Sequence, residues 1–238
     1  NGYGTFSLDA GGGWSYTMSS AHDEFVAGTT YTDSFTASTA DGTTRRVTVT
    51  ITGSNDIASL GSDAGFITET DLSQAIGGSL TLTDPDAVAA SVVAQSDTLG
   101  TYGRFSIDAS GTWTYATAGA LDALAAGQVV SDVFNVATTD GGSATVTITL
   151  TGSNDAPTVA SPIAGQRATQ DSAFRFTLPA GSFADVDTGD SLGYSATGLP
   201  AWLSFDAATR TFSGTPANAD VGRVSITVIA TDASSAQA

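Results

Sequence analysis

The sequence repeats itself at an offset of 99 residues, and this repeat limits the possible folds more than any other feature of the chain. Of the first 56 positions, 26 carry the same residue 99 positions later, with no gap. The shared patterns are Tyr-Gly-x-Phe at 3–6 and 102–105, Trp-x-Tyr at 14–16 and 113–115, and Thr-Gly-Ser-Asn-Asp at 52–56 and 151–155. We therefore expect a structural unit of 99 residues, and we expect the sequence to begin partway through its first copy.

Alternation of apolar and polar residues within each copy predicts strands. Residues 46–52 and 145–150 alternate branched apolar side chains with threonine, which is the pattern of a strand with one buried face. Asp-Gly pairs at 41–42 and 140–141 precede these strands and predict hairpin turns. The one segment in which we expect a helix is short, residues 118–126. Several short strands per copy, separated by Gly and Asp turns, predict a β-sandwich.

The pattern changes after Asp155. Residues 157–238 carry Leu-Pro-Ala-Trp-Leu at 199–203 and Phe-Ser-Gly-Thr-Pro at 212–216, followed by an alternating segment at 223–230 that predicts a strand. We therefore predict three domains: the C-terminal part of one sandwich at 1–56, a complete sandwich at 57–156, and a sandwich of a different type at 157–238. We expect the last strand of the third sandwich to be missing.

The charged residues are mostly aspartates. The chain has 24 acidic and 7 basic residues, a formal net charge of −17, and only two glutamates, Glu24 and Glu69. Aspartate favours turns over helix interiors, so the carboxylates should lie in loops. So acidic a chain offers no basic face to nucleic acid or to an anionic membrane surface. It has no cysteine, hence no disulfide or thiolate metal site, and no apolar run reaches the ~20 residues of a membrane span.

The 99-residue unit resembles the VCBS repeat of bacterial surface proteins. The matching patterns over residues 1–156 are Tyr-Gly-x-Phe, Asp-x-x-Gly-x-Trp-x-Tyr, Ala-x-Ala-Ala-Gly at 123–127, Thr-x-Asp-Gly, and Thr-Gly-Ser-Asn-Asp-Ala-Pro. Residues 157–238 resemble the dystroglycan-type cadherin-like domain through Leu-Pro-x-Trp-Leu-x-Phe and Phe-x-Gly-Thr-Pro. Such modules occur in tandem in large secreted adhesins, often of the RTX type exported by type I secretion. The resemblance implies an all-β chain of tandem Ig-like and cadherin-like β-sandwiches that bind Ca²⁺ at the joints between domains.

Acidic residues flank both expected joints. An Asn-Asp pair ends each copy, at 55–56 and 154–155, and an Asp-x-Asp turn follows inside the next domain, at 84–86 and 185–187. Ca²⁺ takes roughly six to eight oxygen ligands, and an Asp-x-Asp turn can direct two carboxylates to one side. Asp140 and Asp232 resemble the late aspartate of cadherin sites, and Glu69 resembles the early glutamate that reaches the following joint.

These residues make two candidate calcium sites. The first joint would use the carbonyl of Asn55 with Asp56, Asp84, Asp86 and Asp140. The second would use the carbonyl of Asn154 with Glu69, Asp155, Asp185, Asp187 and Asp232, and Asp190 would be in reserve. The first joint is the poorer, because we expect its upstream glutamate in the missing part of the first copy and because Ala58 stands where the family pattern has proline.

Repulsion between the carboxylates supplies a mechanism. Two like charges about 4 Å apart cost on the order of 1 kcal/mol in water, and several times that near a protein surface. Without a cation this repulsion would push neighbouring domains apart at the joint, and a bound divalent cation would hold them together. We therefore expect calcium-stiffened extender modules of a large secreted adhesin at the bacterial surface, partnered mainly by neighbouring domains of the same chain.

Other functions remain open as alternatives. A carbohydrate-binding module would show a row of exposed aromatic residues, and a homophilic module would bind another adhesin copy. Trp14, Trp113 and Trp202 lie in alternating strand contexts, so we expect them in cores. We expect no enzymatic activity: the one histidine, His22, has no counterpart in the second copy and should lie at the surface, and no carboxylate pair stands out as a glycosidase acid and base.

Overall fold

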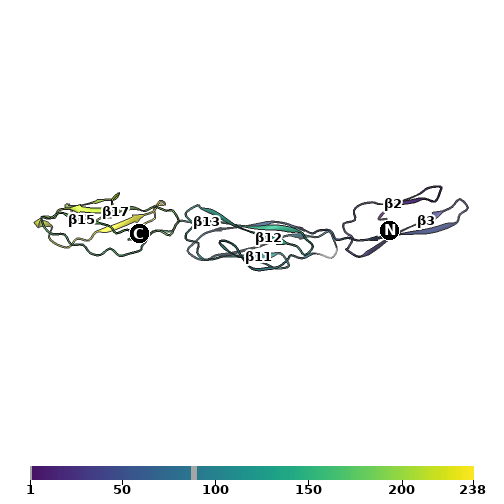
Figure 1. Cartoon of the computed structure of the whole chain (residues 1–238), viewed down its shortest axis with the longest axis horizontal. Helices are drawn as coiled ribbons and strands as arrows, with labels where there is room; N and C mark the ends of the chain where they lie inside the picture. Colours follow the sequence, from purple (N-terminus) through teal and green to yellow (C-terminus); the bar gives the residue numbers. More distant parts are fainter. Residues whose placement is uncertain (1, 87–89) are drawn as a thin grey trace. The chain divides into compact units, whose positions relative to one another are not determined.

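The computed structural model describes residues 2–86 and 90–238, and its regular structure is almost wholly β (Figure 1). These residues include no α-helix, and only the single turn η1 (Asn218–Asp220) is 3-10 helical. The backbone divides into two compact units, one made of residues 1–65, 75–115 and 132–148, the other of residues 66–74, 116–131 and 149–238. The candidate residues of the first joint all belong to the first unit, and those of the second joint all belong to the second.

Residues 2–56 form two antiparallel hairpins. β1 (Gly4–Leu8) pairs with β2 (Trp14–Met18), and β3 (Thr30–Ser38) pairs with β4 (Thr44–Thr52). The carboxylate of Asp9 holds the first turn by accepting the N–H groups of Gly11 and Gly13, each at 2.8 Å. Gly12 has a φ of 85° in this turn, a conformation that glycine adopts without a steric penalty. The predicted strand at 46–52 is confirmed.

The second copy builds two sheets, of three and four strands. One sheet has the order β12-β13-β6 and the other β7-β11-β10-β9, while β5 and β8 form a separate short pair. The predicted strand at 145–150 is confirmed as part of β13. The strands are β5 (Ser59–Leu60), β6 (Asp63–Thr68), β7 (Ala75–Ser79), β8 (Leu82–Thr83), β9 (Gln95–Leu99), β10 (Gly103–Ile107), β11 (Thr112–Thr117), β12 (Val129–Ala137) and β13 (Ser143–Thr151).

Aromatic residues fill the core of the first unit. Phe105 and Trp113 are 0% and 2% exposed, and Phe105 stacks on Phe134 with ring centroids 4.5 Å apart. Tyr115 is equally buried, and its hydroxyl donates to the carboxylate of Asp132 at 2.8 Å. Burial, with help from this hydrogen bond, raises the pKa of Tyr115.

Asp132 also fixes the loop before β10. Besides the hydroxyl of Tyr115, its carboxylate accepts the N–H of Thr101 at 2.7 Å and that of Tyr102 at 3.0 Å. The first copy repeats the arrangement with Asp33, which accepts the hydroxyl of Tyr16 and two backbone N–H groups. The shared aspartate is therefore a structural anchor.

The predicted helix at 118–126 is wrong. These residues form turns, with hydrogen bonds from the N–H of Leu124 to the carbonyl of Leu121 at 2.9 Å and from Gln128 to Ala125 at 2.9 Å. Leu121 has a φ of 64°, and a left-handed residue cannot belong to a right-handed helix. The high alanine content was misleading, because the backbone bends here to bring the turn beside the end of β13.

The third region is a smaller sandwich. One sheet has the order β15-β19-β18, and β17 pairs with β20. Leu178, Leu203 and Phe212 form its buried core. The strands are β14 (Thr158–Val159), β15 (Phe174–Thr177), β16 (Phe183–Ala184), β17 (Gly193–Thr197), β18 (Leu203–Asp206), β19 (Thr211–Gly214) and β20 (Thr227–Thr231). The strand predicted at 223–230 begins only at Thr227, because its partner β17 ends at Thr197, opposite Thr227.

The tryptophans and the histidine differ in part from expectation. Trp113 is buried and Trp202 is half-buried against the third core, as expected. Trp14 is 54% exposed, so the prediction of a core position is wrong for it. The prediction that His22 lies at the surface is also wrong. Its side chain is only 10% exposed and stacks on Phe25 with ring centroids 4.7 Å apart. Among the described residues, no helix has the length and apolar character to cross a membrane.

Candidate metal centre

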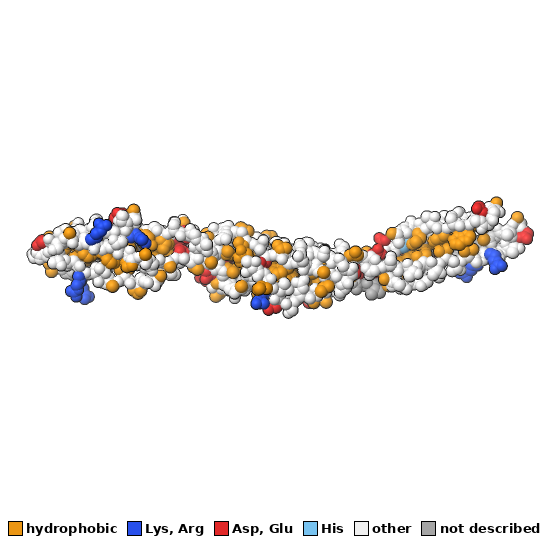
Figure 2. Space-filling view, in the orientation of Figure 1, with side chains coloured by type: hydrophobic (Ala, Val, Ile, Leu, Met, Phe, Trp, Pro, Cys, Tyr) orange, Lys and Arg blue, Asp and Glu red, His pale blue; other side chains and the backbone are white. Residues whose placement is uncertain are grey.

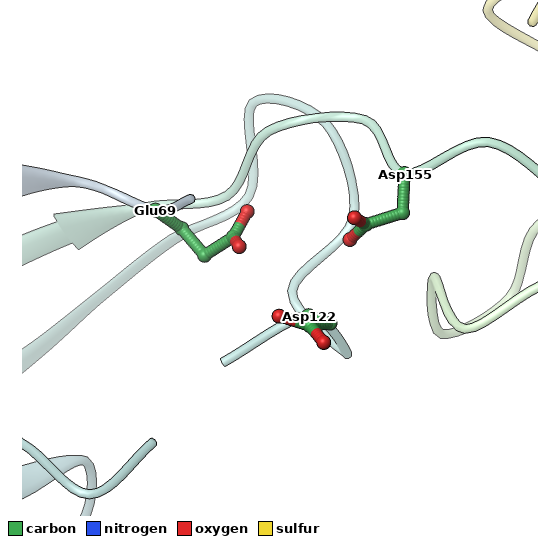
Figure 3. A group of neighbouring side chains, drawn as sticks. All are labelled: Glu69, Asp122 and Asp155. Carbon is green, nitrogen blue, oxygen red and sulfur yellow. The ribbon is translucent and has the colours of Figure 1, made fainter. Parts of the chain in front are cut away.

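Three carboxylates from separate loops meet in the second unit. Glu69 directly follows β6, Asp122 lies in the turn at 118–126, and Asp155 ends the second copy. One carboxylate oxygen of each lies within 4.8 Å of the others. Figure 3 shows the three side chains turned toward a common space. Glu69 is only 2% exposed, so its charge is largely removed from water.

Local structure fixes the position of Glu69. Its backbone N–H donates to the carbonyl of Thr151 at 2.8 Å, and its Oε2 accepts the N–H and the hydroxyl of Ser153 at 3.1 and 2.6 Å. A Cβ atom on Gly152 would lie 2.2 Å from the carbonyl oxygen of Leu124. Glycine is therefore required at position 152, where the Thr-Gly-Ser-Asn-Asp segment passes the turn that carries Asp122.

A second group of carboxylates follows β16. Oxygens of Asp185, Asp187 and Asp190 lie within 4.8 Å of one another. The N–H of Asp187 donates to Oδ1 of Asp185 at 3.0 Å, and the N–H of Asp190 donates to the carbonyl of Asp187 at 3.2 Å. The backbone thus folds into a compact turn that gathers three acidic side chains.

Donors from the end of the second copy join the two groups. The N–H of Asp155 donates to Oδ2 of Asp187 at 3.1 Å, and the side-chain amide of Asn154 donates to Oδ2 of Asp232 at 2.9 Å. The structure therefore brings together all the residues that the sequence assigned to the second joint: Glu69, Asn154, Asp155, Asp185, Asp187, Asp190 and Asp232.

Six buried oxygen atoms at this joint have no hydrogen-bond partner. They are Oε1 of Glu69 and Oδ atoms of Asp122, Asn154, Asp155, Asp185 and Asp187. A buried oxygen without a partner is costly, and a buried carboxylate oxygen more so. Carboxylate and amide oxygens are the ligands that Ca²⁺ takes. The donor set fits a hard divalent cation, which would satisfy these oxygens together.

Burial, with a smaller contribution from neighbouring charges, shifts the pKa values of two carboxyl groups at this joint. Burial raises the pKa of Asp155 to about 6, with the charges of Glu69, Asp122 and Asp187 adding to the increase. Burial also raises the pKa of Asp187. A raised carboxyl pKa means that the neutral form persists to a higher pH than in a free carboxyl group. A cation among these groups would oppose that effect by stabilising the ionised forms.

The first joint repeats part of this arrangement. The N–H of Asp56 donates to Oδ2 of Asp86 at 3.0 Å, and the N–H of Asp86 donates to Oδ1 of Asp84 at 2.9 Å. The first of these contacts matches the one between Asp155 and Asp187, and the second matches the one between Asp187 and Asp185. Oδ1 of Asp86 is buried without a hydrogen-bond partner.

The other predicted residues of the first joint, Asn55 and Asp140, form hydrogen bonds mainly with neighbouring backbone and hydroxyl groups. Asp140 accepts the N–H of Ala58 at 2.6 Å and the hydroxyl of Thr138, and these hydrogen bonds, that of Thr138 first, lower its pKa. The side-chain amide of Asn55 donates to the carbonyl of Asp56 at 3.2 Å. Within the described part of the chain, the groups of three closely spaced acidic oxygens all occur at the second joint.

Sequence reasoning missed Asp122, although the repeat held the signal. Asp23 occupies the same position 99 residues earlier. Burial raises the pKa of Asp56, and the charges of Asp23, Asp86 and Asp84 add to the increase. Asp23 and Asp122 therefore occupy equivalent positions, each near the Asn-Asp pair that ends its copy. A search for acidic residues kept in both copies would have found them.

Comparison with known proteins identifies the class of domain. The family model for a bacterial cadherin-like domain matches residues 55–152, and the model named "Putative Ig domain" matches residues 156–238. No curated protein matches the chain. With the all-β architecture, these matches define tandem cadherin-like and Ig-like β-sandwiches, which suggest an adhesion or extender module. Cadherin-like domains generally bind Ca²⁺, and the acidic groups described above could hold such ions.

Solved cadherin structures share the fold. A protocadherin gamma B7 EC3-6 cis-dimer structure matches with 15% identity and a TM-score of 0.53, covering 100% of this chain and 63% of that chain. Mouse cadherin-23 EC22-24 matches with 16% identity and a TM-score of 0.52, covering 98% of this chain and 77% of that chain. This chain therefore spans less than two thirds of the protocadherin chain.

Proposed function

We propose that this chain consists of calcium-stiffened extender modules from a large secreted adhesin of the bacterial surface. The six buried, unpartnered oxygens at the second joint carry the proposal. The domain boundaries of the proposal are 1–56, 57–156 and 157–238, which place each Asn-Asp pair at a joint. The VCBS type of the first two domains, the RTX context and export by type I secretion belong to the proposal and rest on the sequence patterns.

Named residues would hold the ions. At the second joint, Glu69, Asp122 and Asp155 form one half of the ligand set. The other half is Asp185, Asp187 and Asp190, with Asp232 and Asn154 between the two halves. At the first joint the ligands would be Asp23, Asn55, Asp56, Asp84, Asp86 and Asp140. When bound, Ca²⁺ would supply the positive charge that lets these carboxylates lie together.

The mechanism follows from the balance of charges. Without a cation, the ionised carboxylates on the two sides of a joint repel one another. With one bound, the same oxygens would coordinate the ion together and hold consecutive sandwiches in one orientation. Extracellular calcium modules bind at roughly 10⁻⁴ to 10⁻³ M, so the sites would stay empty in the cytosol and fill outside. The chain would then be loose during export and stiff afterwards.

Two measurements test this proposal. Calorimetric titration with Ca²⁺ should show saturable binding that is weakened in the double variant Asp185→Asn, Asp187→Asn. Small-angle scattering in Ca²⁺ and in EGTA should give a larger and better defined maximum dimension with the ion. An unchanged scattering profile would contradict the stiffening, even if the ion binds.

Adhesion itself is the second candidate function. The exposed ring of Trp14 is a possible stacking surface for a polysaccharide, and the likeness to a protocadherin cis-dimer structure suggests contact with another adhesin copy. Glycan-array binding that Trp14→Ala abolishes would favour the first. A calcium-dependent dimer in light scattering would favour the second.

A further inference from the structure

Glu69 carries its charge inside the fold. Figure 2 shows acidic side chains as small, separate groups on the face in view, although the chain has a formal net charge of −17. Glu69 is only 2% exposed. A buried carboxylate is costly unless its oxygens are hydrogen-bonded or bound to a cation, so the contacts of each oxygen show what this group can do.

The two carboxylate oxygens of Glu69 have different surroundings. Oε2 accepts the backbone N–H of Ser153 at 3.1 Å and its hydroxyl at 2.6 Å. The hydroxyl also lies 3.2 Å from the carbonyl oxygen of Glu69, but it has one hydrogen to donate, and the shorter contact with a charged oxygen is the stronger. Oε1 is buried and has no hydrogen-bond partner. Ser153 therefore holds one oxygen and leaves the other free.

The backbone fixes Ser153 in this position. The N–H of the preceding Gly152 donates to the carbonyl of Gln128 at 2.8 Å, and its carbonyl accepts the N–H of Gly127 at 2.9 Å. Ser153 itself is half-buried. Both of its donors therefore approach the carboxylate from a fixed direction.

The neighbouring carboxylates also present single free oxygens. Oδ1 of Asp122 and Oδ2 of Asp155 are buried without a hydrogen-bond partner, as is Oε1 of Glu69. Figure 3 shows the three side chains around a common space. A carboxylate can bridge two cations only when both of its oxygens are available, and Oε2 of Glu69 is already occupied by two donors.

We propose that Ser153 is a positioning residue that makes Glu69 a one-oxygen ligand, so that the group of Glu69, Asp122 and Asp155 takes a single cation. This inference rests on the calcium sites of the proposed function. Groups that hold a metal ligand from outside the coordination shell typically contribute about 10-fold or more to metal affinity. The serine hydroxyl therefore contributes to calcium affinity without touching the ion.

Infrared spectroscopy of the Glu69 carboxylate tests its coordination. The chain has two glutamates, so cell-free synthesis of the Glu24→Gln variant with isotope-labelled glutamate leaves Glu69 as the labelled glutamate carboxylate. When Ca²⁺ is added, its antisymmetric and symmetric stretching bands should move apart, as they do when a carboxylate binds a metal through one oxygen. A narrowed or unchanged separation in a chain that binds Ca²⁺ overturns the proposal.

Calorimetric titration with Ca²⁺ tests the hydroxyl. The background is the double variant Asp84→Asn, Asp86→Asn, which removes the predicted ligands of the first joint. Ser153→Ala should weaken binding about 10-fold, and Ser153→Thr, which keeps a hydroxyl, should restore most of the affinity. Ser54→Ala is the matched control, because Ser54 has the same place in the first copy and is exposed; it should bind Ca²⁺ like the background.

Urea unfolding in EGTA provides a readout without the ion. Ser153→Ala should still unfold cooperatively, at a lower urea concentration than the wild type because Oε2 loses a donor. If Ser153→Ala does not fold, Ser153→Cys replaces it in the titration, since cysteine has a similar size and only a weak S–H donor. Unweakened calcium binding in the alanine or cysteine variant overturns this inference alone. If the wild type binds no Ca²⁺, the proposed function fails and this inference fails with it.

Discussion

Replacing Glu69 by glutamine should have opposite effects on stability with and without calcium. Glu69 is buried, and its Oε1 has no hydrogen-bond partner. Glutamine keeps the shape and can still accept the hydrogen bonds from Ser153. It removes one negative charge from the group with Asp122 and Asp155, so the calcium-free protein should become more stable. The same change removes a strong calcium ligand, so the calcium-bound protein should lose stability.

The distances set the size of both effects. At 4.8 Å, two unit charges repel by about 0.9 kcal/mol in water and about 3.5 kcal/mol at an effective dielectric constant of ~20. Solvent screens the partly exposed partners, so we expect Glu69→Gln to stabilise the calcium-free form by about 1–2 kcal/mol. Ca²⁺ at ~100 times its Kd stabilises the native protein by about 2.7 kcal/mol, and most of this gain should disappear.

Urea unfolding in EGTA and in excess Ca²⁺ measures both effects. Glu24→Gln is the matched control, because it removes the same charge from the only other glutamate, whose side chain is 66% exposed. The reasoning is refuted if Glu69→Gln and the wild type gain equally from Ca²⁺. It is also refuted if the variant is less stable than the wild type in EGTA.

Three further predictions concern pH, the core and the first joint. In EGTA, the stability of the fold should rise as the pH falls from about 6 toward 3.8. The reason is that the raised pKa of Asp155 lets the folded chain bind more protons than the unfolded chain in this range. Thermal melts at several pH values measure this effect. Asp132→Ala should cost roughly 3 kcal/mol in urea unfolding, because the buried hydroxyl of Tyr115 and two N–H groups lose their acceptor. Asp84→Asn with Asp86→Asn should remove only the calcium bound at the first joint, seen as a lower stoichiometry in calorimetry.

Controls distinguish these effects from general damage. The pH-dependent gain should shrink in Asp155→Asn, with the remainder coming from Asp187 and Asp56, whose pKa values are also raised. Excess Ca²⁺ should reverse its sign, since a bound cation favours the ionised carboxyl. Asp97→Asn, at an exposed aspartate paired with Arg104, should change stability by less than about 1 kcal/mol, because asparagine tolerates the left-handed φ of 54° at this position. An unchanged calcium stoichiometry in the double variant at 84 and 86 would contradict the assignment of those residues.

The strands could be predicted because their pattern is local. The alternation at 46–52 and 145–150 places branched side chains on one face, and the strands form there. The turn at 118–126 could not be predicted in this way. Its alanines favour a helix, but contacts with the end of β13 and the left-handed Leu121 determine its shape. The exposure of Trp14 was also beyond local reasoning, because burial depends on which strands cover the residue.

The candidate site likewise has a part that local sequence predicts and a part that depends on contacts between distant segments. The Asp-x-Asp turns at 84–86 and 185–187 could be read from the sequence, because each gathers its carboxylates within a few residues. The group of Glu69, Asp122 and Asp155 is assembled from three distant loops, so spacing alone could not reveal its third member. Only the comparison of the two copies, which keeps Asp23 and Asp122, contained that information.

The matching contacts of Asp56 with Asp86 and of Asp155 with Asp187 have a consequence for how such chains evolve. The second and third sandwiches have cores of different residues, yet in each an aspartate of the Asp-x-Asp turn accepts the N–H of the preceding Asn-Asp pair. A module with its own packing therefore needs only this short acidic turn to follow any other. Shuffling and duplication can then lengthen the chain without redesigning the connection.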